Sequence, residues 1–258
     1  MTVFRWSQGG RSWQPVEGEA PEGLGGAQVG LYEVLMTSAS AYALSLHADR
    51  IARSWERLTG GPFSAEDVPP LPDVRAEVIR QQWPAFRFEV RRFADESTVA
   101  QIRRRDKPSV KPPVQLLPIE VDAVDAAYPH KSVERDHLRR AYERAVAAGA
   151  DDALFVVGGE VRETAQAFVG FVTAEALVLP PLRQDVLPST TRTAAADWCR
   201  ENGRAVIERP IRMGELDDGT LIYGNALIGL LPAFVAGRAA VPLPGWFDAP
   251  AIGRRLSE

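Results

Sequence analysis

The 258-residue sequence has a single cysteine, few lysines and no long apolar run. One cysteine, Cys199, excludes an internal disulfide and suits a reducing compartment, so we expect a cytoplasmic protein. No segment has the length and apolarity of a signal peptide or of a bilayer-spanning helix. The formal net charge of −4 gives no electrostatic argument for a nucleic acid or a membrane surface as partner. These absences leave a soluble globular chain.

Lysine is the scarce basic residue, because only three of the 30 basic side chains are lysines. Lys107 and Lys111 flank a proline-rich stretch that predicts an exposed linker. Lys131 lies in the sequence Ala-Tyr-Pro-His-Lys-Ser, just before a predicted helix. A lysine amine can lose its proton and condense with an aldehyde or ketone, whereas a guanidinium stays protonated. Lys131 is therefore a candidate reactive amine, and a plain surface lysine is the alternative.

Helical and strand patterns alternate in both halves of the chain, which indicates an α/β (α+β) protein of two domains. A change of composition around the proline-rich stretch predicts the boundary. We expect an N-terminal α/β domain over residues 1–106, an interdomain linker over 107–113 and a C-terminal domain over 114–258.

Hydrophobic periodicity, glycines and prolines predict the individual elements. In the first domain they predict a strand pair over residues 1–15, a loop over 18–30, strands over 31–37, 41–46 and 86–91, and helices over 46–60 and 73–82. In the second they predict strands over 114–121, 153–157, 167–172, 177–179, 205–211 and 221–223, and helices over 132–148 and 190–202. Strand 86–91 alternates apolar and charged residues, so we expect one of its faces in water.

Three features follow Lys131 along the chain. Glu163 supplies a carboxylate after a Gly-Gly turn, and Thr190 and Thr191 open a helix whose free N–H groups can bind a phosphate. Tyr223-Gly-Asn-Ala226 is a break of small residues where backbone can approach a ligand. An amine, a carboxylate and a phosphate cradle are what pyridoxal 5′-phosphate needs. The structural alternatives are a helix cap, a solvated glutamate and an ordinary turn.

The motifs occur in a recognisable order. His-Lys-Ser-x-x-Arg at 130–135 is followed by Gly-Ala-Asp-Asp-Ala-Leu-Phe-Val, Gly-Glu-Val-Arg-Glu-Thr and Leu-Pro-Ser-Thr-Thr-Arg. Upstream, Gly30-Leu-Tyr-Glu and Leu46-His-Ala-Asp-Arg50-Ile-Ala-Arg-Ser54 match looser patterns. Together they resemble the class IV (fold-type IV) enzymes that depend on pyridoxal 5′-phosphate. This family includes branched-chain aminotransferases, D-amino acid aminotransferases and aminodeoxychorismate lyases.

The resemblance implies a small N-terminal α/β domain, a larger C-terminal α/β pseudo-barrel, a small-molecule amino substrate, no metal and a homodimer. It also assigns roles to individual residues. Lys131 is implied as the catalytic residue that forms the Schiff base and moves the substrate proton. The implied cofactor ligands are Glu163 at the pyridine nitrogen and, at or near the phosphate, Arg50, Thr190, Thr191, Asn225 and Ala226. Tyr32 and Arg91 are the implied substrate contacts.

Some positions depart from the family pattern. Gln28 or Val29 stands where an aspartate often precedes the glycine, and Ala167-Phe168 replaces a Ser-Asn pair. Glu134 or Asp136 stands where a tyrosine or asparagine is common. These departures concern the geometry of the substrate more than the cofactor.

The reaction stays open between two classes. His130-Lys131-Ser-Val-Glu-Arg135, the segment Asn225–Pro232 and the short chain favour an aminodeoxychorismate lyase, which converts 4-amino-4-deoxychorismate to 4-aminobenzoate and pyruvate. Leu31-Tyr-Glu-Val is closer to a D-amino acid aminotransferase, and branched-chain amino acids are the other aminotransferase substrates. A cofactor-free α/β protein is the remote alternative.

Overall fold

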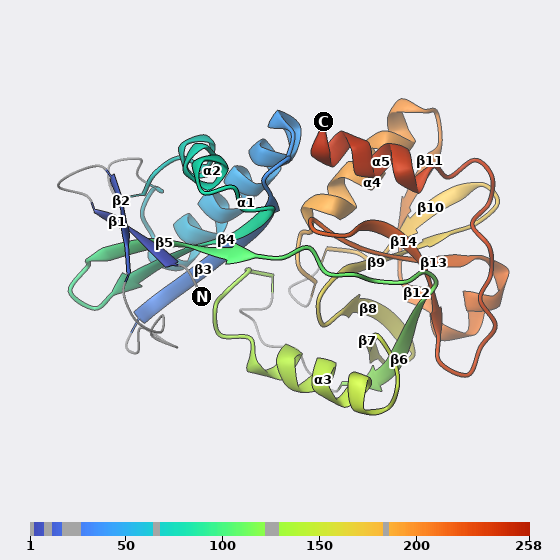
Figure 1. The fold of residues 1–258 in the computed structure, drawn as a ribbon. Coiled ribbons are helices and arrows are strands. Elements are labelled where there is room, and N and C mark those ends of the chain that lie inside the picture. Colours follow the sequence, from blue (N-terminus) through green and yellow to red (C-terminus); the bar gives the residue numbers. More distant parts are fainter. Residues whose placement is uncertain (1–2, 8–11, 17–26, 64–67, 122–128, 183–185) are drawn as a thin grey trace. The chain divides into compact units, whose positions relative to one another are not determined.

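The computed structural model describes residues 3–7, 12–16, 27–63, 68–121, 129–182 and 186–258. The chain forms two compact units (Figure 1). Unit 1 contains Met1–Pro108, His130–Glu134 and Ser257–Glu258, and unit 2 contains Ser109–Pro129 and Arg135–Leu256. Helices and strands occur in both units, which confirms the α/β (α+β) class.

Unit 1 is built on one antiparallel sheet of five described strands in the order β2-β1-β5-β4-β3. Its strands are β1 (Val3–Ser7), β2 (Ser12–Pro15), β3 (Ala27–Met36), β4 (Ala85–Phe93) and β5 (Thr98–Arg105), and its helices are α1 (Ala41–Thr59) and α2 (Leu71–Arg80). The predicted strand pair at the N-terminus is confirmed, and its turn lies outside the described residues.

Two predictions in unit 1 are wrong. Residues 41–46 are the first turns of α1 and not a strand, because the Ser40 hydroxyl caps this helix by accepting from the Ala43 amide at 3.1 Å. Strand β3 already begins at Ala27, within the segment predicted as loop. Gly60 ends α1 as predicted, with a left-handed φ of 74° that a residue with a side chain rarely adopts.

Strand β4 also differs from its prediction, because the face expected in water is largely buried. Glu89 is fully buried and Arg91 nearly so, although both alternate with the apolar residues Phe88 and Val90. The charged side chains pair with one another across this face, so the alternation reflects two buried surfaces of different chemistry.

Unit 2 is built on a mixed sheet of nine described strands in the order β11-β10-β9-β13-β14-β6-β7-β8-β12 (Figure 1). Its strands are β6 (Val114–Glu120), β7 (Asp152–Val157), β8 (Glu160–Thr164), β9 (Phe168–Val172), β10 (Ala176–Leu179), β11 (Ala205–Glu208), β12 (Ile211–Arg212), β13 (Thr220–Asn225) and β14 (Gly229–Val235). The helices of the second half are α3 (Asp136–Ala147), α4 (Thr190–Glu201), the 3₁₀ helix η1 (Met213–Asp218) and α5 (Ala249–Ser257).

The remaining differences are concentrated where strands change partners. The predicted strand 205–211 is two strands: β11 pairs with β10 and β12 pairs with β8, and Pro210 separates them. Strands β5, β8 and β14 and helix α5 are not predicted at all. The predicted helix 132–148 begins only at Asp136, because Ser132 forms a bridge with Leu31 of β3 instead of capping the helix.

Within the described ranges, none of the helices combines the length and apolarity needed to cross a bilayer. The same residues contain no cluster of three or more histidine, cysteine and acidic side chains that could hold a metal ion.

Candidate active site

The segment that carries Lys131 lies along the outer edge of the unit 1 sheet. Strand β3 is the last strand of that sheet, so its outer N–H and C=O groups are available for pairing. The Tyr32 amide donates to the Lys131 carbonyl, and the Val133 amide donates to the Gly30 carbonyl, each at 2.9 Å. Lys131 is therefore fixed by backbone hydrogen bonds on both sides of Leu31.

Gly30 allows this close approach. A Cβ atom at position 30 would lie 2.5 Å from Cγ2 of Val133, well inside van der Waals contact. The glycine of the Gly-x-Tyr-Glu pattern is thus needed for space, because its neighbour across the edge is the lysine-bearing segment.

Side chains fix the same segment on both faces of the sheet. His130 Nδ1 lies 3.1 Å from the Ser54 hydroxyl of α1. Lys131 Nζ lies 5.1 Å from the centroid of the Tyr32 ring, and the guanidinium carbon of Arg87 lies 3.9 Å from that centroid. The structure therefore brings Lys131 and Tyr32 together, with a second cation against the same ring.

Arg50 is held in a buried ion pair. Its Nε donates to Glu33 Oε1 at 2.8 Å and its Nη2 to Glu33 Oε2 at 2.5 Å, and His47 Nδ1 lies 2.7 Å from the same Oε2. Burial alone raises the pKa of Glu33, but the charge of Arg50 and the hydrogen bonds from Arg50 and His47 outweigh burial and lower it. Burial also lowers the pKa of His47, so we take this histidine as a neutral donor to an ionised Glu33.

Arg91 has a comparable partner. Its Nε donates to Glu89 Oε1 at 2.6 Å. The Glu89 carboxylate also accepts hydrogen bonds from Arg87 Nε and Gln101 Nε2. Arg91 is thus fixed in place on β4 and belongs to a cluster of charged residues.

In unit 2, Glu163 is connected to the start of α4. The carboxylate lies on β8, is almost fully buried, and accepts a hydrogen bond from the Leu187 amide at 3.0 Å. Leu187 precedes Ser189, the N-cap of α4. The structure therefore brings Glu163 together with the segment that leads to Thr190 and Thr191.

The first turn of α4 contains an unsatisfied buried hydroxyl. Ser189 Oγ caps the helix by accepting from the Arg192 amide at 3.4 Å. Thr191 Oγ1 is buried and has no hydrogen-bond partner among the residues that the structure describes. A buried hydroxyl beside the N-terminal N–H groups of a 12-residue helix fits a phosphate, which supplies several acceptor oxygens.

Asn225 has a structural role in the turn after β13. Its Oδ1 accepts from the amides of Leu227 and Ile228, and its Nδ2 donates to the Gln166 carbonyl at 3.3 Å. The predicted break at Tyr223–Ala226 is wrong in its bounds, because β13 runs through Asn225 and only Ala226 lies in the turn. The turn is nevertheless tied to the loop between β8 and β9.

A buried carboxylate in the same region was not predicted. Asp152 accepts from the amides of Ala153 at 2.8 Å and Gln166 at 3.1 Å, and from the Tyr223 hydroxyl at 3.2 Å. Burial raises the pKa of Asp152 to about 6, although these hydrogen bonds and Thr164 partly oppose it. Gln166 thus links Asp152 to Asn225.

Each unit brings part of the predicted set together. Unit 1 contains Lys131, Tyr32, Arg50 and Arg91, and unit 2 contains Glu163, Thr190, Thr191, Asn225 and Ala226. The partners Glu33 and His47 lay within the quoted motifs without an assigned role. Their common signal is a polar residue at a position that the helix or strand pattern predicts to be buried.

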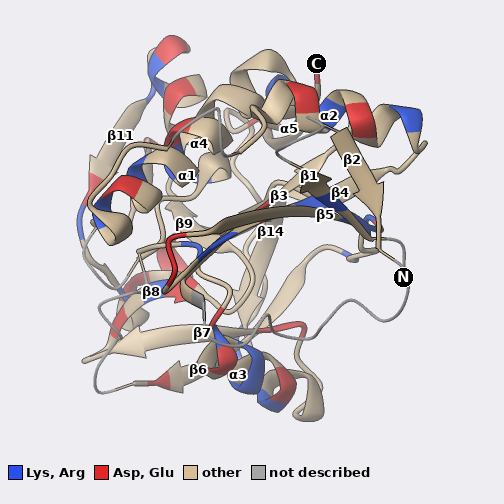
Figure 2. Cartoon of the chain, turned by 90° about the vertical axis from the view of Figure 1, so that its left-hand side faces the viewer, with Lys and Arg blue, Asp and Glu red and all other residues tan. Residues whose placement is uncertain are grey.

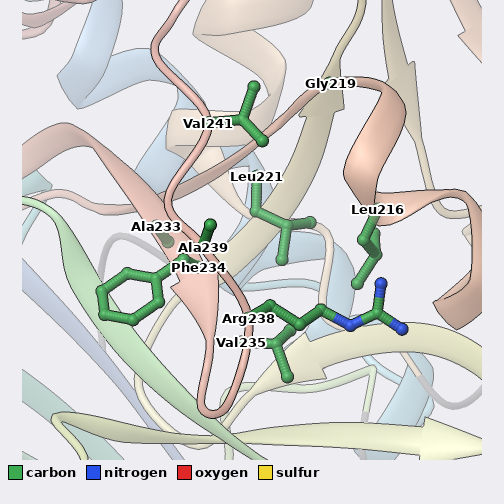
Figure 3. A pocket seen from close by; sticks show the side chains of 9 residues that line it. All are labelled: Leu216, Gly219, Leu221, Ala233, Phe234, Val235, Arg238, Ala239 and Val241. Carbon is green, nitrogen blue, oxygen red and sulfur yellow. The ribbon is translucent and has the colours of Figure 1, made fainter.

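A small cavity in unit 2 contains none of these residues (Figure 3). It is lined from η1, β13, β14 and the following turn, with Leu216, Leu221, Val235 and Arg238 among its side chains. Its interior of about 10 Å³ holds at most one water molecule. A substrate therefore does not bind there.

Comparison with known proteins shows the family. The model of the family described as amino-transferase class IV matches residues 30–233, and the chain belongs to this family. No curated protein sequence matches it. The predicted membership and the predicted dependence on pyridoxal 5′-phosphate are confirmed, so the protein is a class IV enzyme that uses this cofactor.

Solved structures show the fold. The PLP-bound form of a hypothetical aminotransferase from Mycobacterium tuberculosis aligns with a TM-score of 0.78 at 17% identity, over 98% of this chain and 97% of that chain. A branched-chain aminotransferase from Thermoproteus uzoniensis with norvaline aligns with a TM-score of 0.79 at 18% identity, over 98% and 92%. The 4-amino-4-deoxychorismate lyase from Pseudomonas aeruginosa aligns with a TM-score of 0.74 at 18% identity, over 89% and 90%. The predicted fold-type IV architecture is confirmed.

Proposed function

We propose that the protein is a lyase of the aminodeoxychorismate type, in which Lys131 is the catalytic residue. Lys131 is chosen because of its placement. Its backbone carbonyl accepts a hydrogen bond from the Tyr32 amide of β3, and its Nζ lies against the Tyr32 ring. Lys107 and Lys111 lie in the segment that joins β5 to β6, outside either sheet. Lys131 is thus the lysine whose position is fixed by a folded element.

Pyridoxal 5′-phosphate, when bound, withdraws electrons from the substrate carbon next to the amine. In the proposal Lys131 holds the cofactor covalently and then moves a proton at that carbon. Glu163 would hold a proton at the ring nitrogen, and this role is supported by its burial and by the hydrogen bond from the Leu187 amide, which fix the position of the carboxylate. Thr190, Thr191 and Arg50 bind the phosphate, while Asn225 and Ala226 shape the nearby turn.

Two sequence features support the lyase. Segment 130–135 and segment 225–232 resemble the corresponding lyase motifs, and the family fold includes a lyase among its aligned structures. An aminotransferase is the second candidate, because Leu31-Tyr32-Glu33-Val34 resembles the D-amino acid aminotransferase strand and a branched-chain aminotransferase aligns with a TM-score of 0.79, against 0.74 for the lyase. Tyr32 and Arg91 contact the substrate in this proposal whichever of the two reactions takes place.

The role of Lys131 is tested by covalent labelling. We expect the purified protein to be yellow and, after borohydride reduction, to carry the cofactor mass on the peptide that contains Lys131. Lys131→Arg and Lys131→Ala remove both signals, whereas the matched control Lys107→Arg keeps them. A colourless protein that takes up no added cofactor, or a label on another residue, contradicts the proposal.

The reaction is tested with amino donors alone. A lyase keeps its visible absorbance when D-amino or branched-chain amino acids are added, and it releases pyruvate from 4-amino-4-deoxychorismate. Rapid bleaching by an amino acid, with recovery on adding a keto acid, identifies an aminotransferase instead.

We further propose a cytoplasmic homodimer. The family resemblance supports the dimer, and the single free cysteine, Cys199, supports a reducing compartment. Light scattering of the purified protein tests the dimer, and a monomeric mass contradicts it.

A further inference from the structure

The strands of unit 2 carry few acidic residues, which Figure 2 draws in red. Two of these residues are buried: Glu163 on β8 is 3% exposed, and Asp152 at the start of β7 is 0% exposed. Glu163 has a proposed role at the cofactor, whereas Asp152 has none. Asp152 is therefore the buried carboxylate of this sheet that the proposed chemistry leaves unexplained.

Stability of the fold alone explains Asp152 poorly. Its partners are two backbone amides and the Tyr223 hydroxyl, and within the described ranges no basic side chain pairs with it. Buried charges in proteins are ordinarily paired with an opposite charge. Because burial raises the pKa of Asp152 to about 6, the ionised group lowers stability at neutral pH. Carboxylates whose pKa is shifted in this way are concentrated at functional sites.

One oxygen of Asp152 links two segments of unit 2. Its Oδ2 accepts from the Gln166 amide at 3.1 Å and from the Tyr223 hydroxyl at 3.2 Å. Gln166 lies in the loop between β8 and β9, and Tyr223 lies on β13. Strands β8 and β13 do not pair with each other in the sheet. The side chain of Asp152 thus connects two strands that no ladder of backbone hydrogen bonds joins.

The first of these segments carries Glu163. Gln166 follows Glu163 by three residues. Between them, Thr164 Oγ1 donates to the Ala167 carbonyl at 2.7 Å and accepts from the Ala167 amide at 2.8 Å, which closes a tight turn. A shift of Gln166 is therefore transmitted through this turn to the end of β8, where Glu163 lies.

The second segment carries Asn225 and Ala226. Tyr223 precedes Asn225 by two residues on β13. The Asn225 side chain closes the following turn through its Oδ1 and donates from Nδ2 to the Gln166 carbonyl at 3.3 Å. Gln166 is thus held through its amide by Asp152 and through its carbonyl by Asn225.

We propose that Asp152 is a positioning residue for the cofactor: it fixes the spacing between Glu163 and the turn at Asn225–Ala226, so that the ring nitrogen and the phosphate are bound at the same time. This inference rests on the cofactor contacts of the proposed function. An ionised carboxylate suits the task, because it only accepts hydrogen bonds and one oxygen can accept two. Groups held in place before a ligand arrives need not be ordered when it binds.

The test compares two ligands, pyridoxal 5′-phosphate and pyridoxal, which differ only in the phosphate. An absorbance titration of the full-length protein, stripped of cofactor, measures both dissociation constants. Their ratio measures what the phosphate contributes while the ring is also bound. We expect pyridoxal to bind at least about tenfold more weakly to the unaltered protein, since hydrogen bonds to a charged group contribute that order of affinity. A variant that is merely less stable binds both ligands less well and keeps the ratio.

Two variants disturb the link to different extents. Asp152→Ala removes the acceptor that Gln166 and Tyr223 share, and Tyr223→Phe removes one donor and keeps the ring. We expect the ratio to fall about tenfold in Asp152→Ala and about threefold in Tyr223→Phe, in line with the loss of two hydrogen bonds and of one. If Asp152→Ala does not fold, Tyr223→Phe decides the outcome.

Thr220→Val is the matched control on the same strand. Thr220 is 1% exposed and lies at the opposite end of β13 from Asn225, and its hydroxyl donates to the Pro242 carbonyl at 2.7 Å. This variant also loses a buried hydrogen bond of a hydroxyl, but one that joins neither segment. We expect a lower free energy of unfolding and an unchanged ratio.

The outcomes separate this inference from the proposed function. If the borohydride label appears on Lys131 and the unaltered protein prefers the phosphorylated ligand, but the ratio stays the same in the folded variants or falls equally in Thr220→Val, only the role of Asp152 is wrong. If the label is absent, or the unaltered protein binds both ligands equally, the proposed cofactor contacts are wrong and the inference fails with them.

Discussion

Lys131 contacts Tyr32 twice, once through each residue's backbone and once through the side chains. The Lys131 carbonyl accepts from the Tyr32 amide at 2.9 Å, and Lys131 Nζ lies 5.1 Å from the centroid of the Tyr32 ring. The backbone bond does not depend on the residue type at position 32. Substitutions of Tyr32 therefore change the ring contact and leave the backbone contact in place.

Tyr32→Ala is expected to weaken cofactor binding by about 2- to 30-fold, because the ring contact with a cation contributes about 0.5–2 kcal/mol. Tyr32→Phe keeps the ring face and is expected to bind within about twofold of the unaltered protein. Visible absorbance during a cofactor titration measures both. Equal losses in the two variants would assign the effect to the hydroxyl and contradict the ring contact.

Gly30→Ala is expected to disturb the lysine segment through Val133. The added Cβ would lie 2.5 Å from Val133 Cγ2, while the Val133 amide is held by the Gly30 carbonyl. We expect a loss of about 1–3 kcal/mol in the free energy of unfolding, together with weaker cofactor loading. Chemical denaturation and visible absorbance measure the two effects.

The double variant Gly30→Ala with Val133→Ala is the matching control. Removing both Cγ atoms leaves only Val133 Cβ, at 3.5 Å from the new methyl group, which is an ordinary contact. We expect most of the cofactor loading to return. A double variant as poorly loaded as Gly30→Ala alone would show that the clash with Val133 is not the cause.

Glu33→Gln is expected to destabilise unit 1 strongly. It leaves the Arg50 guanidinium buried without its bidentate carboxylate, which costs about 3–5 kcal/mol. Glu96→Gln removes an exposed ion pair with Arg92 and is expected to cost less than about 1 kcal/mol. Denaturant unfolding at neutral pH compares them, and similar losses would contradict the strong coupling of Glu33 to Arg50.

The ion pair of Glu33 with Arg50 predicts that the free energy of unfolding depends on pH. Because the pKa of Glu33 is lowered from its ordinary value of 4.5, the stabilisation from its charge is complete above that value and is lost in more acidic solution. The unfolding free energy of the unaltered protein should therefore fall below pH 4.5 more steeply than that of Glu33→Gln. Parallel pH profiles would contradict this.

For Asp152, the dependence of stability on pH has the opposite sign to that for Glu33. Its pKa is raised from 3.8 to about 6, so the folded state binds more protons than the unfolded state between these values. Stability from this group is complete at low pH and decreases as the pH rises through 6, by about 3 kcal/mol for a shift of about 2 units. Asp152→Asn removes this decrease, so its stability relative to the unaltered protein should improve between pH 4 and pH 7. A constant difference over this range contradicts the raised pKa.

Sequence patterns predicted the elements whose residues pack locally. Helix α4 was predicted almost to the residue, because Ser189 caps it and Gly203 follows it. The order of the motifs predicted the family and the fold, which the comparisons confirm. Local signals of this kind are contained within one turn of helix or one strand.

What the sequence did not predict depends on long-range pairing. The segment 130–134 joins unit 1 because its backbone pairs with β3, about a hundred residues earlier in the chain. The sequence predicted a solvated Glu89, because this residue alternates with apolar residues as an exposed residue does. The alternation does not reveal that arginines pair with Glu89. Arg103 and Glu89 lie on different strands, and they become neighbours only through the register in which β4 and β5 pair.

Thr191→Val separates a binding role from a folding role. The hydroxyl of Thr191 is buried without a partner among the described residues, so replacing it with a methyl group leaves the free energy of unfolding of the protein without cofactor unchanged or slightly higher. If the hydroxyl binds the phosphate, the same change weakens cofactor binding by about 10-fold or more, as expected for a hydrogen bond to a charged group.

Thr193→Val is the control on the same helix. Thr193 Oγ1 already donates to the Ser189 carbonyl at 3.2 Å, so this variant loses an internal hydrogen bond and about 1 kcal/mol of stability, while cofactor affinity stays the same. Denaturant unfolding without cofactor and an absorbance titration with it measure the two quantities. If Thr191→Val destabilises the protein without weakening cofactor binding, its hydroxyl is part of the fold and does not bind the phosphate.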